Sequence, residues 1–227
     1  MSEKKKELIS LIIGYAGVFL SLLGVNVFHR FVLMSLPLGL RMAAMIVMYW
    51  LFALVPVIVM LVCKDKFADY WSNHRVGHQI LAGILIGAAM SLVLTLVPHL
   101  VGFGVYVQNG KRYIHLWQFA YEFLYCIAAV GLVEEFIFRG FIYNKIKKIS
   151  GNDIAAVIGS SVLFGLFHIL SGNIVQMIMT AFLGVLWCLC RLKIKNCTLL
   201  SLIIAHGIYD ALITVWASVF LEYVFIL

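Results

Sequence analysis

Long apolar runs alternate with short polar segments along almost the whole chain of 227 residues. Several of these runs extend for about 18 residues or more with almost no charge, which is the length that a helix needs to cross a bilayer. The pattern therefore predicts an all-α, polytopic transmembrane helix bundle of about seven spans, with an eighth span as the alternative. The predicted spans cover residues 8–28, 41–63, 79–97, 116–143, 154–170, 174–190 and 198–227.

Single prolines and glycines predict irregularities within these spans. Pro56 predicts a kink in the second span and Pro98 an end to the third, because proline lacks the N–H that a helix interior needs. Gly83 and Gly87 form a GxxxG motif, which is typical of a close contact between membrane helices. The last run is too long for one perpendicular span and too short for two spans with a turn. We therefore expect one long or bent final helix, with Gly207 as its break.

Charge is scarce and unevenly placed. Only 12% of the residues are charged, against about a quarter in soluble domains. A net charge of +7 would indicate nucleic acid in a soluble protein. Here the lysines and arginines follow the loops instead, so we expect a lipid bilayer and no nucleic acid as partner. Twelve fall on one side, four on the other, and Arg139 lies in the membrane. The twelve are Lys4, Lys5, Lys6, Lys64, Lys66, Arg75, Lys145, Lys147, Lys148, Arg191, Lys193 and Lys195, and the four are Arg30, Arg41, Lys111 and Arg112.

This bias predicts the orientation of the chain. The cytoplasmic side of a membrane protein carries the excess of lysine and arginine, so the side with twelve is expected to be cytoplasmic. The N-terminus then lies inside the cell. The charged head at residues 1–7 and the lack of eukaryotic sorting signals favour a bacterial plasma membrane as the location.

Three charged side chains interrupt the fourth predicted span, in the stretch VGLVEEFIFRGFIY. A charge at the middle of a membrane helix costs about 3 kcal/mol or more, so each must face protein, water or another charge. Glu135 and Arg139 are four positions apart and share a helix face, which predicts an ion pair. Glu134 is rotated by about 100° from Glu135 and points elsewhere. The predicted ion pair therefore accounts for Glu135, and no partner is predicted for Glu134.

Two further polar motifs lie in later spans. FGLFH places Phe164 and His168 on the fifth span, and HGIYD places His206 and Asp210 four apart on one face of the seventh. Counted from the cytoplasmic helix ends, all these groups lie roughly 13–24 Å into a core about 30 Å thick. The shared depth predicts one polar site built from the fourth, fifth and seventh spans. Glu122 and Glu222, near other span ends, are predicted to be interfacial.

Such a cluster suits two chemistries, and each motif also has a purely structural interpretation. A carboxylate and a histidine can activate water for hydrolysis, or acids and histidines can relay protons through a transporter. Alternatively, the histidines are helix contacts and the charged groups are satisfied pairs. An acid without a partner and the common depth favour a functional site. Transport is disfavoured because no matching pair of broken helices is visible.

The three motifs, in this order on successive late spans, resemble the CPBP family. Its members are the type II CAAX prenyl endopeptidases and the bacterial bacteriocin-processing or Abi proteins. The resemblance covers about residues 117–213 and implies an intramembrane helical bundle with a membrane-embedded site. It divides the chain into accessory helices over 1–115 and a catalytic core over 116–227. The residues that carry it are Glu134, Glu135, Arg139, Phe164, His168, His206 and Asp210.

The resemblance also implies roles for these residues. Glu134 would activate water with His168 as its partner, and His206 with Asp210 would stabilise the oxyanion. Glu135, Arg139 and Phe164 would support the site. The family pattern often ends in Asn where this chain has Asp210, and an ionised Asp cannot donate to an oxyanion. Asp210 then orients His206 and keeps it protonated, stays neutral, or binds a metal.

The metal question stays open at this point. Glu134, His168, His206 and Asp210 together could supply oxygen and nitrogen ligands for zinc. A glutamate-activated water without metal uses the same residues, and we favour that mechanism.

The sequence thus predicts an intramembrane endopeptidase, whose substrate is a leader peptide, a signalling peptide or another membrane protein. The alternative is a non-catalytic scaffold or regulator that binds a sensor kinase or acts in bacteriocin immunity. Substrate, cleavage site and oligomeric state are not predicted.

Overall fold

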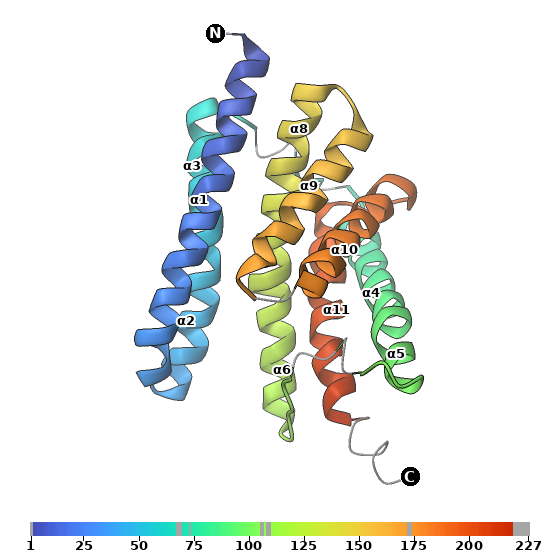
Figure 1. Cartoon of the computed structure of the whole chain (residues 1–227). Helices are drawn as coiled ribbons and strands as arrows, with labels where there is room; N and C mark the ends of the chain where they lie inside the picture. The colour runs from blue at the N-terminus through green and yellow to red at the C-terminus, as the bar shows by residue number, and fades with distance from the viewer. Residues whose placement is uncertain are drawn as a thin grey trace. The chain divides into compact units, whose positions relative to one another are not determined.

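The computed structural model describes residues 2–66, 70–72, 74–104, 107, 110–171 and 174–219. Within these residues every regular element is helical (Figure 1). Seven helical stretches in this part are long and apolar enough to cross a membrane, which confirms the all-α, seven-span prediction. They cover Glu3–Ser35, Leu38–Cys63, Val76–Leu100, Leu116–Ser150, Asp153–Leu170, Ile174–Lys193 and Leu199–Val219.

The first five spans each join several helical elements, whereas α10 and α11 are single helices. The α-helices are α1 (Glu3–Phe31), α2 (Leu38–Trp50), α3 (Leu54–Cys63), α4 (Val76–Ser91), α5 (Val97–Leu100), α6 (Leu116–Tyr125), α7 (Leu132–Glu135), α8 (Tyr143–Ser150), α9 (Asp153–Phe167), α10 (Ile174–Lys193) and α11 (Leu199–Val219). Between them lie 3₁₀ turns at η1 (Leu33–Ser35), η2 (Leu51–Ala53) and η8 (His168–Ser171), and π-helical segments at η4 (Leu92–Leu96), η6 (Cys126–Gly131) and η7 (Phe136–Ile142).

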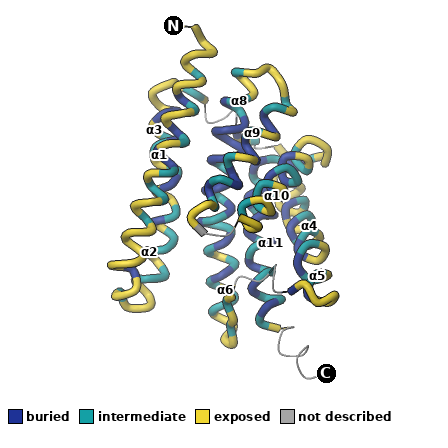
Figure 2. The backbone as a smooth tube through the Cα atoms, in the orientation of Figure 1, coloured by how far each residue is buried: buried dark blue, intermediate teal, exposed yellow. Residues whose placement is uncertain are grey.

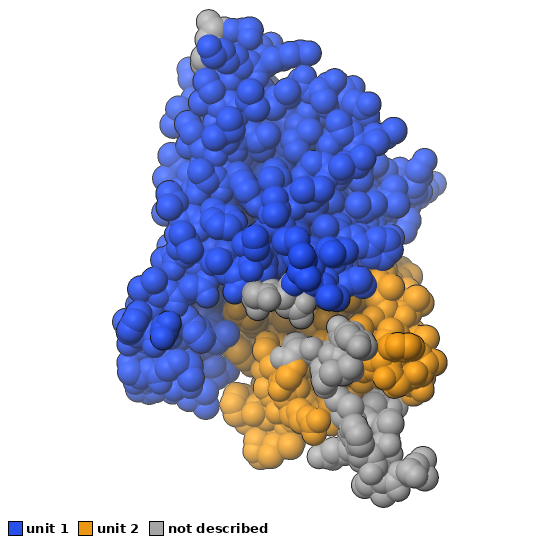
Figure 3. Space-filling model, in the orientation of Figure 1, with its two compact units in different colours: residues 1–72, 133–195 blue, residues 73–132, 196–227 orange. Residues whose placement is uncertain are grey.

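The chain forms two compact units, coloured separately in Figure 3. Unit 1 contains residues 1–72 and 133–195, and unit 2 contains residues 73–132 and 196–227. Each unit combines segments that are far apart in the sequence, because the units are defined by contacts in three dimensions. The predicted division at residue 115 separates accessory helices from a catalytic core, and it stays a prediction.

In unit 1, α1 packs against α3 and α8, and α9 packs against α8 and α10. The contact of α1 with the fourth span is close at Gly14, where an added Cβ would lie 2.4 Å from the ring of Phe141. A glycine is needed at such a contact because it lets the two helices approach. The fit places α1 directly beside η7, the segment that carries Arg139.

The second span contains a 3₁₀ turn shortly before Pro56, the residue at which a kink was predicted. Pro56 is the third residue of α3, and the 3₁₀ turn η2 lies directly before that helix. Proline cannot donate to the carbonyl four positions back, which belongs to Phe52, and its ring clashes there. The local geometry therefore changes over η2, and Phe52 within that turn is buried.

In unit 2, the GxxxG motif lies where α4 packs on α11, which confirms the predicted close contact. A Cβ at Gly83 would lie 2.6 Å from the carbonyl oxygen of Ser201, and one at Gly87 would lie 2.5 Å from that of Ala205. The predicted break at Gly207 is wrong, since α11 continues through it. Gly207 instead provides room for Ile127, whose Cα would lie 2.5 Å from an added Cβ.

Two predicted boundaries change in the third and seventh spans. Pro98 does not end the third span, because it lies in the first turn of α5, where the missing N–H is tolerated. The predicted seventh span extends to residue 227, but its last eight residues, including Glu222, lie outside the described residues.

Helical geometry around Glu134 and Glu135 is irregular. Both residues lie on the short helix α7, which is flanked by the π-helical segments η6 and η7. Such segments are rare and occur frequently at functional sites. Side chains from outside the π-helical ladder bind backbone carbonyls in η7. Asn144 donates to the carbonyl of Gly140 at 2.6 Å, and Arg191 donates to that of Arg139 at 2.7 Å.

Residues along the spans differ in how far they are buried (Figure 2). Many large apolar side chains are exposed on the outer faces of the helices, as expected where lipid replaces water as the neighbour. Glu134, Glu135 and Arg139 are buried instead, each 1% exposed or less. The polar groups of the fourth span are therefore enclosed by protein.

Candidate active site

The predicted ion pair within EExxxR is present in unit 1. Nη1 of Arg139 donates to Oε1 of Glu135 at 2.9 Å, and both side chains are inaccessible to solvent. A charge at this depth is tolerated only with a partner, and removing one member of a buried pair costs about 3–5 kcal/mol. The pair thus links the end of α7 to η7 and keeps both charges compensated.

Phe164 connects this pair to the second motif. The guanidinium of Arg139 lies over the Phe164 ring, 4.4 Å from its centroid. In the described part of the chain Nε and Nη2 of Arg139 have no hydrogen-bond partner, so the ring face and Glu135 provide its observed compensation. The Phe164 ring also meets the imidazole of His168 edge-on, with centroids 5.1 Å apart. Phe164 therefore lies against both motifs, as a supporting residue must.

His168 is held at the C-terminal end of α9. Its Nδ1 lies 3.0 Å from the carbonyl oxygen of Phe164. A carbonyl oxygen only accepts, so Nδ1 carries the hydrogen, and Nε2 of the neutral ring then holds the lone pair. The Phe167 ring packs edge-on against the imidazole at 5.3 Å. This arrangement orients His168 to act through Nε2 as a base or a ligand.

Glu134 has a hydrogen-bond partner, whereas helical spacing predicted none. The hydroxyl of Tyr49, on α2, donates a hydrogen bond to Oε1 of Glu134. The two residues are 85 positions apart, so no periodic pattern connects them. The first three spans contain none of the three polar motifs, and the only signal for Tyr49 in the sequence is a phenol within an apolar span. Sequence reasoning therefore missed this residue.

His206 and Asp210 form the predicted contact within unit 2. Nε2 of His206 lies 3.3 Å from Oδ2 of Asp210. The imidazole is buried, whereas the side chain of Asp210 is 28% exposed. Among the three predicted roles of Asp210, this geometry supports the one in which it orients His206. Glu134 and His168 lie in unit 1, and their convergence with His206 stays a prediction.

No group of three His, Cys, Asp or Glu side chains within the described residues of either unit is arranged to hold a metal ion. A zinc site made of the four predicted ligands would take two from unit 1 and two from unit 2. The carboxylate oxygens and imidazole nitrogens of these four residues are donor atoms that zinc accepts. His168 is also held through Nδ1, in the manner common to zinc-binding histidines. Zinc therefore stays a prediction.

Glu122 is buried and ion-paired, while its predicted position at the membrane interface stays a prediction. Its Oε1 accepts hydrogen bonds from Lys111 at 2.7 Å and from Thr214 at 3.0 Å, and Oε2 accepts one from Tyr113 at 2.9 Å. Burial, and then the neighbouring charge of Glu122, raise the pKa of Tyr113 well above its usual range. Glu122 thus binds the segment before α6 to α6 and α11, and none of the three motifs contains it.

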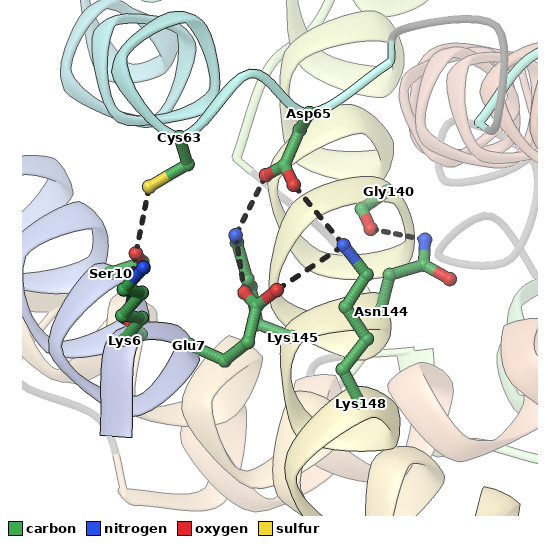
Figure 4. A network of polar contacts seen from close by, with 9 residues as sticks. All are labelled: Lys6, Glu7, Ser10, Cys63, Asp65, Gly140, Asn144, Lys145 and Lys148. Atoms are coloured by element: carbon green, nitrogen blue, oxygen red, sulfur yellow. Dashed lines mark hydrogen bonds and ion pairs between the residues drawn. The ribbon is translucent and has the colours of Figure 1, made fainter. Parts of the chain in front are cut away.

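Unit 1 also contains a network of charged side chains that joins separate segments (Figure 4). Lys145 of α8 is fully buried between Oε2 of Glu7 at 2.5 Å and Oδ2 of Asp65 at 2.7 Å. Lys148 completes the ring, at 3.4 Å from Glu7 and 3.1 Å from Asp65. Two positive and two negative side chains balance one another. The ring joins α1, the residues after α3, and α8, which continues the helix that carries Glu134.

This network predicts an acid-sensitive contribution to stability. Burial opposes ionisation of Asp65, but the hydrogen bonds and charges of Lys145 and Lys148 outweigh it, so its pKa in the folded protein lies below the ordinary 3.8. Because the folded-state pKa is the lower one, the contribution is complete above the ordinary value and is lost as the pH falls through the folded value. Asp65→Asn should lower the free energy of unfolding at pH 7 by about 1.5–3 kcal/mol. Unfolding of the wild-type chain and of Asp65→Asn in detergent, at pH 7 and below pH 4, measures the effect of the substitution and the effect of acid.

Asp153→Asn is the matched control, since Asp153 pairs with Lys147 at 2.8 Å while both side chains are about half exposed. An exposed pair contributes at most about 1 kcal/mol. Equal losses in the two variants would contradict the importance of the buried ring.

Comparison with known proteins identifies one related family. Residues 116–212 match the family described as type II CAAX prenyl endopeptidase Rce1-like. The matched region contains all seven residues of the three motifs and excludes Tyr49 and the first three spans. No curated protein and no solved structure gives a significant match to the chain.

Proposed function

We propose that the chain is an intramembrane endopeptidase, because residues 116–212 match the type II CAAX prenyl endopeptidase Rce1-like family. It hydrolyses a peptide bond of a membrane-associated peptide or protein. The observation that carries the proposal is the buried arrangement of unit 1, in which Glu134 is enclosed by protein and His168 is held in one orientation. A buried carboxylate and an oriented imidazole are the parts that water activation requires.

In the proposed reaction, Glu134 takes a proton from water as the water oxygen bonds to the carbonyl carbon of the peptide. A tetrahedral oxyanion forms, then collapses as the C–N bond breaks and the leaving nitrogen takes up a proton. His168 suits the orientation of water or the transfer of that proton, because its Nδ1–H is engaged by a backbone carbonyl and Nε2 holds the lone pair. The products are a new carboxylate and a new amine.

His206 and Asp210 are assigned to the oxyanion by family resemblance. An ionised carboxylate cannot donate a hydrogen bond, so the donor must be His206. The position of the Asp210 carboxylate beside Nε2 of His206 supports an orienting role for Asp210. In this proposal Glu135, Arg139 and Phe164 hold the groups in place through the buried pair and the stacked ring.

The proposed mechanism needs no metal, and zinc bound by Glu134, His168, His206 and Asp210 is the alternative. Bound zinc would activate the same water as a Lewis acid. The proposed setting is the bacterial plasma membrane with a cytoplasmic N-terminus, and the proposed substrate is a leader peptide, a signalling peptide or another membrane protein. Bacteriocin processing belongs to this class of reaction.

Hydrolysis in a bilayer tests the proposal directly. The purified full chain in liposomes is incubated with a panel of membrane-associated leader and signalling peptides in water enriched in ¹⁸O. We expect one cleaved bond per substrate, with one ¹⁸O atom in the new carboxyl terminus, seen by mass spectrometry. The same rate after chelator treatment supports the metal-free mechanism, and its loss supports zinc. No product, or a product without ¹⁸O, would contradict hydrolysis and favour the scaffold or regulator function.

A further inference from the structure

Tyr49 lies in the second span, outside the matched family region and outside every motif of the sequence. It is nevertheless the residue whose hydroxyl reaches Oε1 of Glu134. We propose that Tyr49 is a positioning residue, which holds one oxygen of the Glu134 carboxylate so that the other oxygen takes the proton from water. This inference rests on the proposed function and assigns a part of the site to the accessory helices.

The Tyr49 ring is itself held in place by aromatic contacts. Tyr49 occupies the last turn of α2, and Phe52 lies three positions later in the 3₁₀ turn η2. Residues three apart in such a turn lie nearly above one another. The two rings accordingly meet nearly edge-on, with centroids 4.9 Å apart. The irregular turn next to Pro56 thus fixes the direction of the Tyr49 side chain.

The same contacts continue to the second motif. Phe52 is buried and packs edge-on against Phe167, with centroids 5.5 Å apart. Phe167 in turn lies 5.3 Å from the imidazole of His168 and 5.6 Å from the ring of Phe138. Tyr49 therefore contacts Glu134 through its hydroxyl and is connected to His168 through two packed rings. All these residues belong to unit 1, so one connected set of contacts orients both predicted water-activating groups.

A phenol suits this role chemically. An ionised carboxylate only accepts hydrogen bonds, and a phenol at neutral pH has one hydrogen to donate. The bond engages one lone pair of Oε1 and so fixes the plane of the carboxylate relative to the Tyr49 ring. Hydrogen bonds to a charged group are among the stronger ones in proteins. Rotation of the carboxylate away from the reactive position is therefore opposed.

Tyr49→Phe removes only the hydroxyl and keeps the ring on Phe52. In liposomes, with a peptide that the wild-type chain cleaves, kcat should fall about 10- to 100-fold while KM changes by less than about twofold. The matched control is Tyr15→Phe, which removes a hydroxyl that donates to the carbonyl of Leu163 at 2.9 Å. That hydrogen bond is also in unit 1 but joins α1 to α9, so kcat should remain that of the wild-type chain. A second variant, Phe52→Leu, keeps the Tyr49 hydroxyl but loosens its support, and kcat should fall in it as well.

A thermal double-mutant cycle supplies a readout that does not depend on catalysis. Tyr49→Phe should lower the unfolding midpoint of the wild-type chain and have a smaller effect in the Glu134→Ala background. Equal effects in both backgrounds would show that the two side chains do not interact, and would overturn the inference. The inference would also be overturned if Tyr49→Phe kept the wild-type kcat while Glu134→Ala was inactive. Full activity of Glu134→Ala itself would instead overturn the proposed function, so the two failures are distinguishable.

Discussion

Replacement of Glu134 by glutamine is expected to abolish peptide cleavage, with a loss in kcat of at least about 10²–10⁴-fold. The amide keeps an oxygen that can accept the hydrogen bond from Tyr49, so the fold and the local contact should persist. It cannot take a proton from water, because an amide oxygen is far less basic than a carboxylate. The rate of product formation in liposomes measures the effect.

Glu122→Gln is the control for this variant. Glu122 is likewise a buried glutamate on the fourth span, but it lies in unit 2 and binds Lys111, Tyr113 and Thr214. Its replacement should leave kcat within a small factor of the wild-type value if the chain folds. His168→Ala should abolish cleavage as Glu134→Gln does, and so should His206→Ala if the proposed oxyanion role is right. Cleavage at the wild-type rate in Glu134→Gln would remove the proposed base.

Replacement of Arg139 by methionine is expected to have the largest effect on stability. The substitution removes the ion-pair partner of the Glu135 carboxylate, which is inaccessible to solvent. The expected loss is about 3–5 kcal/mol in the free energy of unfolding, from removal of one partner of a buried pair. A domain is typically stable by only about 5–15 kcal/mol, so much of the protein should fail to fold. Reversible unfolding in detergent gives the free energy.

The double variant Glu135→Gln/Arg139→Met separates charge from packing. Removing both charges relieves the stranded carboxylate, so the double variant should be more stable than Arg139→Met alone. It also loses the guanidinium over Phe164, which holds the ring that His168 packs on. Cleavage should therefore remain reduced even where stability returns. If the double variant were as unstable as the single one, loss of packing and not the unpaired charge would be the cause.

The buried contacts of unit 1 form two routes between the first two motifs. One runs from Glu135 through Arg139 and Phe164 to His168. The other runs from Glu134 through Tyr49, Phe52 and Phe167 to the same imidazole. Both start on α7, between two π-helical segments, where the spacing of side chains differs from that of a regular helix. The routes explain how two neighbouring acids come to have different partners.

Much of the local structure could be predicted because it depends on short spacing. The number of spans followed from the length of apolar runs, and the pairs Glu135–Arg139 and His206–Asp210 followed from a separation of four positions. Helix geometry brings such residues together wherever the helix lies, and the cost of a charge in lipid requires that they pair. The GxxxG contact was predictable for the same reason, since it depends on residue size at one helix face.

Contacts between distant segments were decided only by the tertiary structure. Tyr49 meets Glu134 across 85 positions, Thr214 meets Glu122 across 92, and Glu7 meets Lys145 across 138. The periodicity of a helix says which face a residue occupies but not which other helix covers that face. In lipid, the apolar surfaces of different helices are nearly equivalent, so steric fit and a few polar groups select the neighbours. The amino-acid sequence alone therefore determined the spans and the pairs within each helix, and packing determined that the second span supplies the partner of Glu134.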